Sequence, residues 1–188
     1  RESDEVFTVA VAPPAAYDGF EPGQFNMLYL PGRGEAAISI SGDPGDSSRL
    51  THTVRAVGNV TKALADIRPP AHIGLRGPFG RGWPLAEAQG RELLLIAGGI
   101  GLAPLRPVLY AAMTAPERFA RITVLLGARS PGDLLFTEEL LRWKFECGLQ
   151  LLASVDNATF DWRGDVGVIT GLIPRLNICL LYTSDAAD

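Results

Sequence analysis

A glycine-rich turn between two apolar segments constrains the fold of this chain more than any other feature. Residues 94–104 read LLIAGGIGLAP, so an apolar run ends in three glycines within four positions and then resumes. The run before the glycines, residues 92–97, is continuous, as expected of a strand covered on both faces. The segment after them predicts a helix over residues 103–113, with Pro104 near its first turn. A buried strand that turns directly into a helix indicates a parallel α/β sheet.

The same rhythm continues after this first unit. Residues 121–126 predict a second buried strand, and residues 150–154 predict a third. Between them, residues 137–146 predict an amphipathic helix with Thr137 as its N-cap. A last helix is expected near residues 172–176. Strand, helix, strand, helix, strand is the doubly wound α/β pattern, with three recognisable strands here.

The first 85 residues have a different punctuation. Glycine and proline number 21 and 14 in the whole chain, an excess that signals many tight turns. One short helix is expected at residues 60–67, before Pro69-Pro70. Short strands at turn-rich spacing predict a small antiparallel barrel or sandwich. These strands are expected at residues 6–12, 24–30, 36–41, 50–57 and 71–76.

The change of rhythm near residues 84–90 predicts two domains. We expect an antiparallel β-barrel over residues 1–86 and an α/β domain over residues 87–177. Residues 178–188 look like translated sequencing adapter, so the native sequence is expected to end near Asn177, and Cys179 is not interpreted as a ligand.

Composition excludes several classes of function. The 17 basic and 21 acidic residues give a net charge of −4, and neither half offers a basic nucleic-acid surface. No apolar run approaches the roughly 18 residues that would predict a membrane span. Two cysteines form neither a disulfide framework nor a metal-ligand spacing. Low cysteine use, together with the lack of a signal-peptide pattern, favours a cytoplasmic protein.

The glycine turn offers a specific chemistry. Glycines at positions 98, 99 and 101 let a ligand approach the backbone without meeting a Cβ atom. The following helix N-terminus presents N–H groups and a positive dipole end, which suit a pyrophosphate. The spacing differs from the G-x-G-x-x-G pattern, and tight packing is the alternative explanation for these glycines.

The end of the second predicted strand carries a further candidate. Gly127-Ala128-Arg129 lies at the carboxyl end of that strand, where ligands bind in open α/β sheets. Arg129 would pair with a phosphate or stack on adenine, or else be a solvated residue of a turn. Asp133 and Phe136 in the same loop are weaker candidates.

Candidates in the first half have equally open interpretations. Thr61 would either bind a phosphate or cap the short helix, and the cap is favoured. Ser39 is expected to be a polar strand residue, and Arg55 either a surface charge or a phosphate partner. The turn-rich segment 77–83, GPFGRGW, would form a ligand wall between the halves or a simple interdomain turn.

The remaining chemistry-bearing residues do not form a catalytic pattern. His52 and His72 both fall in predicted strands and are interpreted as structural. No Ser/His/Asp order, paired carboxylates or metal-ligand cluster stands out in the sequence. No catalytic acid or base is therefore predicted.

The order of these motifs resembles that of the ferredoxin–NADP reductase superfamily. AAISIS at residues 36–41 is followed by HTVRAVGNVTKAL at 52–64 and GLRGPFGRGWP at 74–84. IAGGIGLAPLRPVLY at 96–110 and LLGARSPGDLLF at 125–136 complete the series. The resemblance covers residues 5–176. Within this superfamily, the sequence most resembles the gamma subunits of hydrogenases and sulfhydrogenases. The relatives of these subunits include dihydroorotate dehydrogenase electron-transfer subunits.

The resemblance implies a flavin-binding barrel followed by a nicotinamide-dinucleotide domain. Ala36 and Ile38 depart from the family's flavin motif, which usually has arginine and tyrosine there. The implied FAD-binding residues are Ser39, Thr53, Val54, Arg55, Val60 and Thr61. The implied residues for NAD(P)H are Gly98, Gly99, Gly101 and Pro104 at the pyrophosphate loop, and Gly127 and Arg129 at the adenosine end.

The resemblance also implies a function. It indicates a flavin-dependent oxidoreductase module that moves electrons between NAD(P)H and an iron–sulfur partner, such as a hydrogenase subunit. A dihydroorotate dehydrogenase electron-transfer subunit and a non-catalytic nucleotide-binding module are the alternatives. Relatives often carry a Cys-Gly-Pro segment and a cysteine cluster for a [2Fe–2S] centre further along, and neither is seen in this sequence. NAD(P)H reduction of the flavin is therefore expected to be slow or absent.

Overall fold

The computed structural model describes residues 1–176 of the 188-residue chain. Six elements form the first half: β1 (Val6–Val11), β2 (Phe25–Leu30), β3 (Gly34–Ser39), β4 (Leu50–Arg55), α1 (Asn59–Asp66) and β5 (Gly74–Phe79). All strand pairs here are antiparallel, in the orders β1-β4 and β3-β2-β5. An isolated bridge between Ile40 and His52 links the two sheets. The predicted antiparallel architecture is confirmed.

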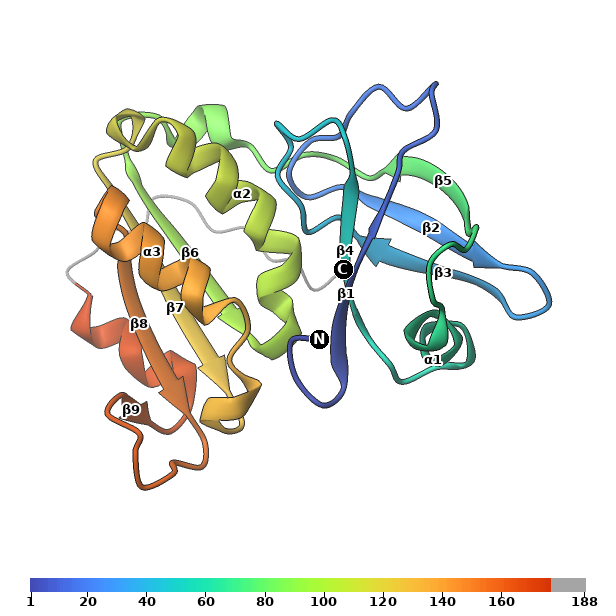
Figure 1. Ribbon diagram of the computed structural model, residues 1–188. Coiled ribbons are helices and arrows are strands. Elements are labelled where there is room, and N and C mark those ends of the chain that lie inside the picture. Colours follow the sequence, from blue (N-terminus) through green and yellow to red (C-terminus); the bar gives the residue numbers. More distant parts are fainter. Residues whose placement is uncertain (177–188) are drawn as a thin grey trace.

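The second half is a parallel sheet with helices (Figure 1). Its main elements are β6 (Glu92–Gly98), α2 (Leu102–Thr114), β7 (Arg121–Ala128), α3 (Thr137–Cys147), β8 (Gln150–Val155), β9 (Asp165–Val166) and the 3₁₀-helix η5 (Ile169–Arg175). The strand order is β6-β7-β8-β9. Buried side chains of α2 and α3 pack with those of β6 and β7 in one core. The predicted doubly wound class is confirmed.

Burial explains why β7 is apolar throughout. Residues 122–127 are all buried, with α2 and α3 on one face and η5 against the other. A strand covered on both faces has no solvent side that could be polar, which is the pattern that the sequence shows.

The structure corrects four sequence-based expectations. Thr137 is not an N-cap, because Phe136 precedes the helix in the left-handed conformation and no side chain caps it. His72 lies before β5 rather than in a strand, and it is exposed. The parallel sheet has a fourth strand, β9, whose two residues are too short to give a periodic signal. The final helix is η5, a 3₁₀-helix that starts at Ile169.

The connection between the halves lies near residues 84–90, where the sequence changes from short, turn-rich strands to alternating strands and helices. The Trp83 N–H donates to the Pro22 carbonyl at 2.8 Å, which ties the linker to the first half. Trp83 and Leu85 pack against the core of the second half. We refer to residues 1–86 as the antiparallel half and to residues from 87 onward as the parallel half.

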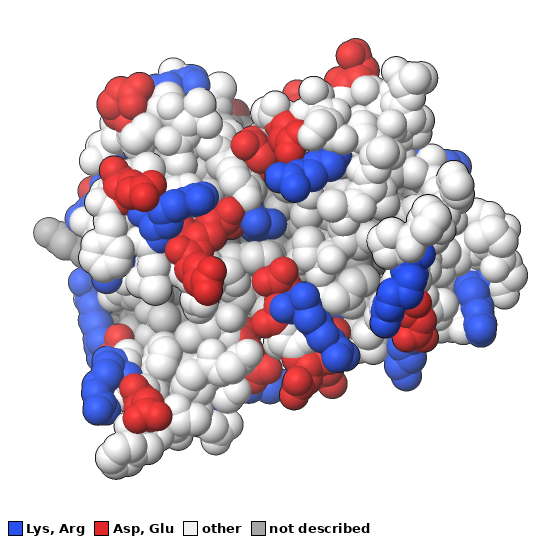
Figure 2. Space-filling view, in the orientation of Figure 1, with Lys and Arg blue, Asp and Glu red and all other residues white. Residues whose placement is uncertain are grey.

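The surface carries both signs of charge. In Figure 2, Lys and Arg side chains lie next to Asp and Glu side chains at several separate places on a mainly uncharged face. Within residues 1–176, no helix has the length and apolar character needed to cross a bilayer.

Candidate functional site

The glycine turn joins β6 to α2 in an open geometry. Gly98 ends β6, Gly99–Gly101 form a 3₁₀ turn, and α2 starts at Leu102. A Cβ atom built on Gly98 or Gly101 would meet no atom within 4 Å. Only Gly99 has a backbone conformation that itself favours glycine, with φ +52°. The fold alone therefore does not require Gly98 and Gly101, and the space beside them is available to a ligand.

Gly127 differs from these two glycines. It lies near the end of β7, beside Gly98 in the register of the sheet. A Cβ atom on Gly127 would lie 2.9 Å from Cβ of Ile169 in η5. This contact is too close for an unshifted structure, so Gly127 is needed for packing against η5.

A cavity of about 590 Å³ opens at the carboxyl ends of β6, β7 and β8. This size is typical of small-molecule sites, and the position is where open α/β sheets bind ligands. Five of the predicted binding residues line it together: Arg55, Gly98, Gly99, Gly127 and Arg129. The structure thus joins one residue of the antiparallel half to four of the parallel half.

The charged side chains of the cavity are of both signs. Arg55 forms an ion pair with Glu5 at 2.8 Å, so this guanidinium already has a partner. Ser130 donates its hydroxyl to Asp133 at 2.8 Å. Arg129 is exposed, and its carbonyl accepts the Asn157 N–H at 2.8 Å.

Sequence reasoning missed three acidic residues of this cavity: Asp4, Glu5 and Asp156. Asp156 directly follows β8, so the rule about strand carboxyl ends would have found it. Glu5 precedes β1 and reaches the cavity only through the pairing of β1 with β4, which no local pattern reveals.

Predicted flavin residues on β3 and β4 have their polar groups engaged by the protein. The Thr53 hydroxyl lies 2.8 Å from the Ser41 hydroxyl and 3.1 Å from that of Thr8. Val54 is fully buried, and the Ser39 carbonyl lies 3.1 Å from Nδ1 of His52. The Thr53 hydroxyl and the Ser39 carbonyl are therefore already engaged within the protein.

Thr61 acts as a helix-capping residue. Its hydroxyl oxygen accepts the backbone N–H groups of Gly58 at 2.9 Å and Val57 at 3.1 Å. Of the two interpretations left open by the sequence, the cap is the one that the structure shows. Val60, the residue before it, packs against the apolar cluster of Leu28 and Leu30.

A residue that sequence reasoning did not select lies beside this helix start. Asn59 donates its side-chain amide to the Arg33 carbonyl at 3.1 Å, so the β2–β3 turn lies next to the N-terminus of α1. Arg33 is exposed. No sequence pattern singled out Arg33, because its contact with Asn59 depends on how the β2–β3 hairpin packs against α1.

His52 holds the centre of the antiparallel half. It is fully buried, and its Nε2 lies 3.4 Å from the Asn26 side-chain amide, which also accepts the Tyr17 hydroxyl at 3.2 Å. Burial lowers the pKa of His52. The neutral ring, donating from Nδ1 to Ser39 and accepting at Nε2, satisfies both nitrogens.

The remaining candidates lie outside the cavity. Gly101 and Pro104 are at the start of α2 but not in its lining, and no residue of segment 77–83 lines it. Within that segment, Phe79 packs on Phe25 with ring centroids 5.7 Å apart. Among residues 1–176, no group of three or more His, Cys, Asp or Glu side chains is arranged to hold a metal ion.

An antiparallel half followed by a parallel sheet with a glycine turn at its first strand defines the class: a two-part, dinucleotide-binding type of fold. Residues 95–176 match the family described as "Oxidoreductase NAD-binding domain". The chain is 38% identical over 147 residues to sulfhydrogenase 1 subunit gamma of Pyrococcus furiosus, covering 77% of this chain and 50% of that protein.

Two further comparisons point to the same kind of protein. The chain is 36% identical over 149 residues to a probable dihydroorotate dehydrogenase B (NAD(+)) electron transfer subunit of Methanocaldococcus jannaschii, covering 77% of this chain and 50% of the relative. The crystal structure of a ferredoxin NADP+ reductase from Neisseria gonorrhoeae with bound FAD and NADP superposes with a TM-score of 0.75 at 21% identity, covering 91% of this chain and 70% of that chain.

The chain belongs to the ferredoxin–NADP reductase superfamily, as its motif order predicted. It spans about half the length of the curated relatives that it matches.

Proposed function

We propose that this chain is the FAD- and NAD(P)H-binding part of an electron-transfer oxidoreductase subunit, of the kind found in hydrogenases. Electrons would pass between NAD(P)H and an iron–sulfur partner. FAD, when bound, supplies the exchange between two-electron and one-electron chemistry, and the protein supplies binding and orientation. The division into a flavin domain at 1–86 and a nucleotide domain at 87–177, and a cytoplasmic location, belong to the same proposal.

The observation that carries the proposal is the open space beside Gly98 and Gly101. Glycine at these positions has no use in the fold, because a Cβ atom would meet nothing there. A pyrophosphate that packs against the backbone would use that space. In this proposal Gly98, Gly99, Gly101 and Pro104 bind the nicotinamide dinucleotide, and Gly127 with Arg129 contacts its adenosine end.

FAD would bind to the antiparallel half. The first N–H groups of α1 have no partner within the helix and suit a pyrophosphate, and Thr61 stabilises that helix start. Arg33, whose backbone carbonyl accepts the Asn59 side-chain amide beside this helix start, would supply a positive charge there and compensate for Ala36. Backbone atoms of Ser39, Thr53 and Val54 would contact the flavin. Arg55 and Val60 complete the proposed set.

Direct binding tests the proposal. The purified chain should quench FAD fluorescence on titration, and NADH or NADPH should raise its thermal stability. The relative response to NADH and NADPH will decide which of the two is the physiological donor. A folded chain that binds neither FAD nor nicotinamide dinucleotide would refute the proposal.

A second candidate function shares the same cofactors. The similarity to the dihydroorotate dehydrogenase B electron transfer subunit favours a dehydrogenase partner in place of a hydrogenase. Electron transfer after mixing with each type of catalytic subunit would discriminate the two. The predicted non-native tail and Cys179 lie outside the described residues, and a [2Fe–2S] centre remains part of the proposal for a longer protein.

A further inference from the structure

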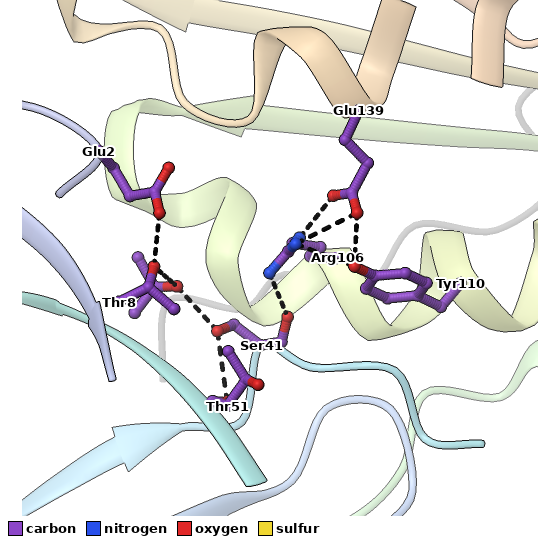
Figure 3. Close-up of polar contacts among 8 residues, drawn as sticks. Glu2, Thr8, Ser41, Thr51, Arg106, Tyr110 and Glu139 are labelled. Atoms are coloured by element: carbon purple, nitrogen blue, oxygen red, sulfur yellow. Dashed lines mark hydrogen bonds and ion pairs between the residues drawn. The ribbon is translucent and has the colours of Figure 1, made fainter. Parts of the chain in front are cut away.

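Arg106 extends from α2 toward the antiparallel half (Figure 3). Its Nη1 donates to the Ser41 carbonyl at 3.0 Å, just after β3. Its Nε and Nη2 donate to the two carboxylate oxygens of Glu139 at 2.6 and 3.2 Å. Nη2 also donates to the Tyr110 hydroxyl at 2.9 Å. The side chains of Arg106 and Glu139 are each only 15% exposed, so little solvent screens these contacts.

This arginine makes an unusual connection between the halves. Its bond to Ser41 crosses from the parallel to the antiparallel half far from the junction, where local backbone hydrogen bonds such as Glu87 N–H to the Pro84 carbonyl also cross the boundary. Ser41 is itself anchored, because its hydroxyl lies 2.8 Å from that of Thr53 in β4. Thr53 in turn contacts Thr8 in β1, whose hydroxyl donates to Glu2. The guanidinium is therefore linked to β4 and β1 indirectly, through Ser41 and the hydroxyl contacts of Thr53 and Thr8.

The other end of the network reaches the cavity. Glu139 lies in α3, and the guanidinium of Arg106 stacks over the Phe136 ring at 4.2 Å. Phe136 is the left-handed residue, φ 56°, that ends the loop after β7. Asp133 and Leu135 of that loop line the cavity. One side chain thus contacts the antiparallel half and the segment that shapes the proposed nucleotide site.

The chemistry of the cluster favours a fixed geometry over a gain in stability. A buried ion pair is often no more stabilising than apolar side chains of similar volume. A planar guanidinium, however, fixes directions, since its donors leave the plane at set angles. Burial and the bond to Glu139 raise the pKa of Tyr110, so its hydroxyl stays protonated and donates to Glu139 at 2.5 Å. The guanidinium, the carboxylate and the hydroxyl of the cluster are then all hydrogen-bonded, and Oε1 of Glu139 accepts from both Arg106 and Tyr110.

We infer that Arg106 is a positioning residue that fixes the orientation of the parallel half relative to the antiparallel half. The consequence for electron transfer rests on the proposed function. If flavin and nicotinamide bind on opposite halves, this orientation sets how their reacting atoms face each other.

The orientation can be measured without any cofactor. Spin labels on Lys62→Cys in α1 and Lys144→Cys in α3, with Cys147→Ser and Cys179→Ser, report the distance between the halves by double electron–electron resonance. We expect one narrow distance distribution for the parent chain and a clearly broader or shifted one for Arg106→Met. The variant Arg106→Met with Glu139→Gln removes the carboxylate that would be left unpaired, and it should broaden in the same way.

Two variants control this experiment. Arg76→Met breaks an ion pair with Glu35 inside the antiparallel half and should leave the distribution unchanged. Arg106→Lys keeps the positive charge but loses the planar guanidinium with its several fixed N–H donors. We expect this variant to broaden the distance distribution as well. A distribution for the folded double variant that is as narrow and centred as that of the parent would overturn the inference.

A second readout tests the consequence. Stopped-flow reduction of bound FAD by NADH should slow by about 10- to 100-fold in the double variant, since a displacement of about 1 Å has effects of this order. The Kd values for FAD and NADH, measured separately, should stay the same. A parent chain that does not bind FAD would refute the proposed function. The spin-label distances would still test whether Arg106 fixes the orientation of the two halves. A broadened distance with unchanged reduction would refute the link to electron transfer.

Discussion

Replacing Gly101 with valine separates the fold from the proposed ligand. Gly101 has φ −58° and ψ −15°, a conformation that any residue adopts, and a Cβ atom there has open space. Valine at the N-cap of a helix is less favourable than glycine by no more than about 1 kcal/mol. For a chain of this size, that corresponds to a fall in Tm of roughly 2–4 °C.

Ligand binding should respond far more strongly. A nucleotide at 100 times its Kd stabilises the native state by about 2.7 kcal/mol, which raises Tm by roughly 5–11 °C. The two γ-methyl groups of valine would occupy the space left beside Gly101, so we expect this increase to disappear in Gly101→Val. Differential scanning fluorimetry with and without NADH measures both quantities in one experiment.

The matched control is Gly171→Val. Gly171 lies in η5, away from the glycine turn, and a Cβ atom there also meets nothing within 4 Å. This variant should keep the full NADH-induced increase in Tm. If Gly101→Val keeps the increase too, the glycine turn does not bind the dinucleotide. If Gly101→Val unfolds the chain, the reasoning about open space is wrong.

Three further predictions address the antiparallel half. His52 has a lowered pKa, so the unfolded chain binds a proton more readily than the folded chain. The free energy of unfolding should therefore fall as pH drops below about 6.5, and His52→Gln should flatten this slope in urea titrations. A parent chain whose stability is constant between pH 7 and pH 5 would contradict this. Gly77→Ala should lower the free energy of unfolding by about 2 kcal/mol or more, because its Cβ would lie 2.1 Å from Oδ1 of Asn26 and its φ of +143° is strained for alanine; an unchanged urea midpoint would be the opposite result. Arg33→Ala should weaken FAD binding by roughly 10-fold, in line with a lost charge-assisted bond of about 1.5 kcal/mol, whereas Arg76→Ala should not; equal FAD titration curves for the two variants would exclude Arg33 as a phosphate partner.

Local patterns predicted most of the architecture. The apolar runs before Gly98 and Gly127 became β6 and β7, because a strand buried on both faces must be apolar throughout. The helix capped by Thr61 was also predictable, since capping uses neighbours within one turn. The strand β9 was not, because two residues paired to β8 leave no periodic pattern.

The sequence by itself determined most of the strands and helices, with β9 as an exception, and it determined that a glycine turn follows the first parallel strand. Only the tertiary structure decided which side chains contact one another and which are left to bind a ligand. It placed Glu5 beside Arg55 in the cavity, buried Thr53 in a hydroxyl network and brought Arg106 from α2 to Ser41. These contacts join residues 50, 12 and 65 positions apart. Periodicity and capping report only on neighbours along the chain, whereas contacts at such separations depend on how the sheets and helices pack.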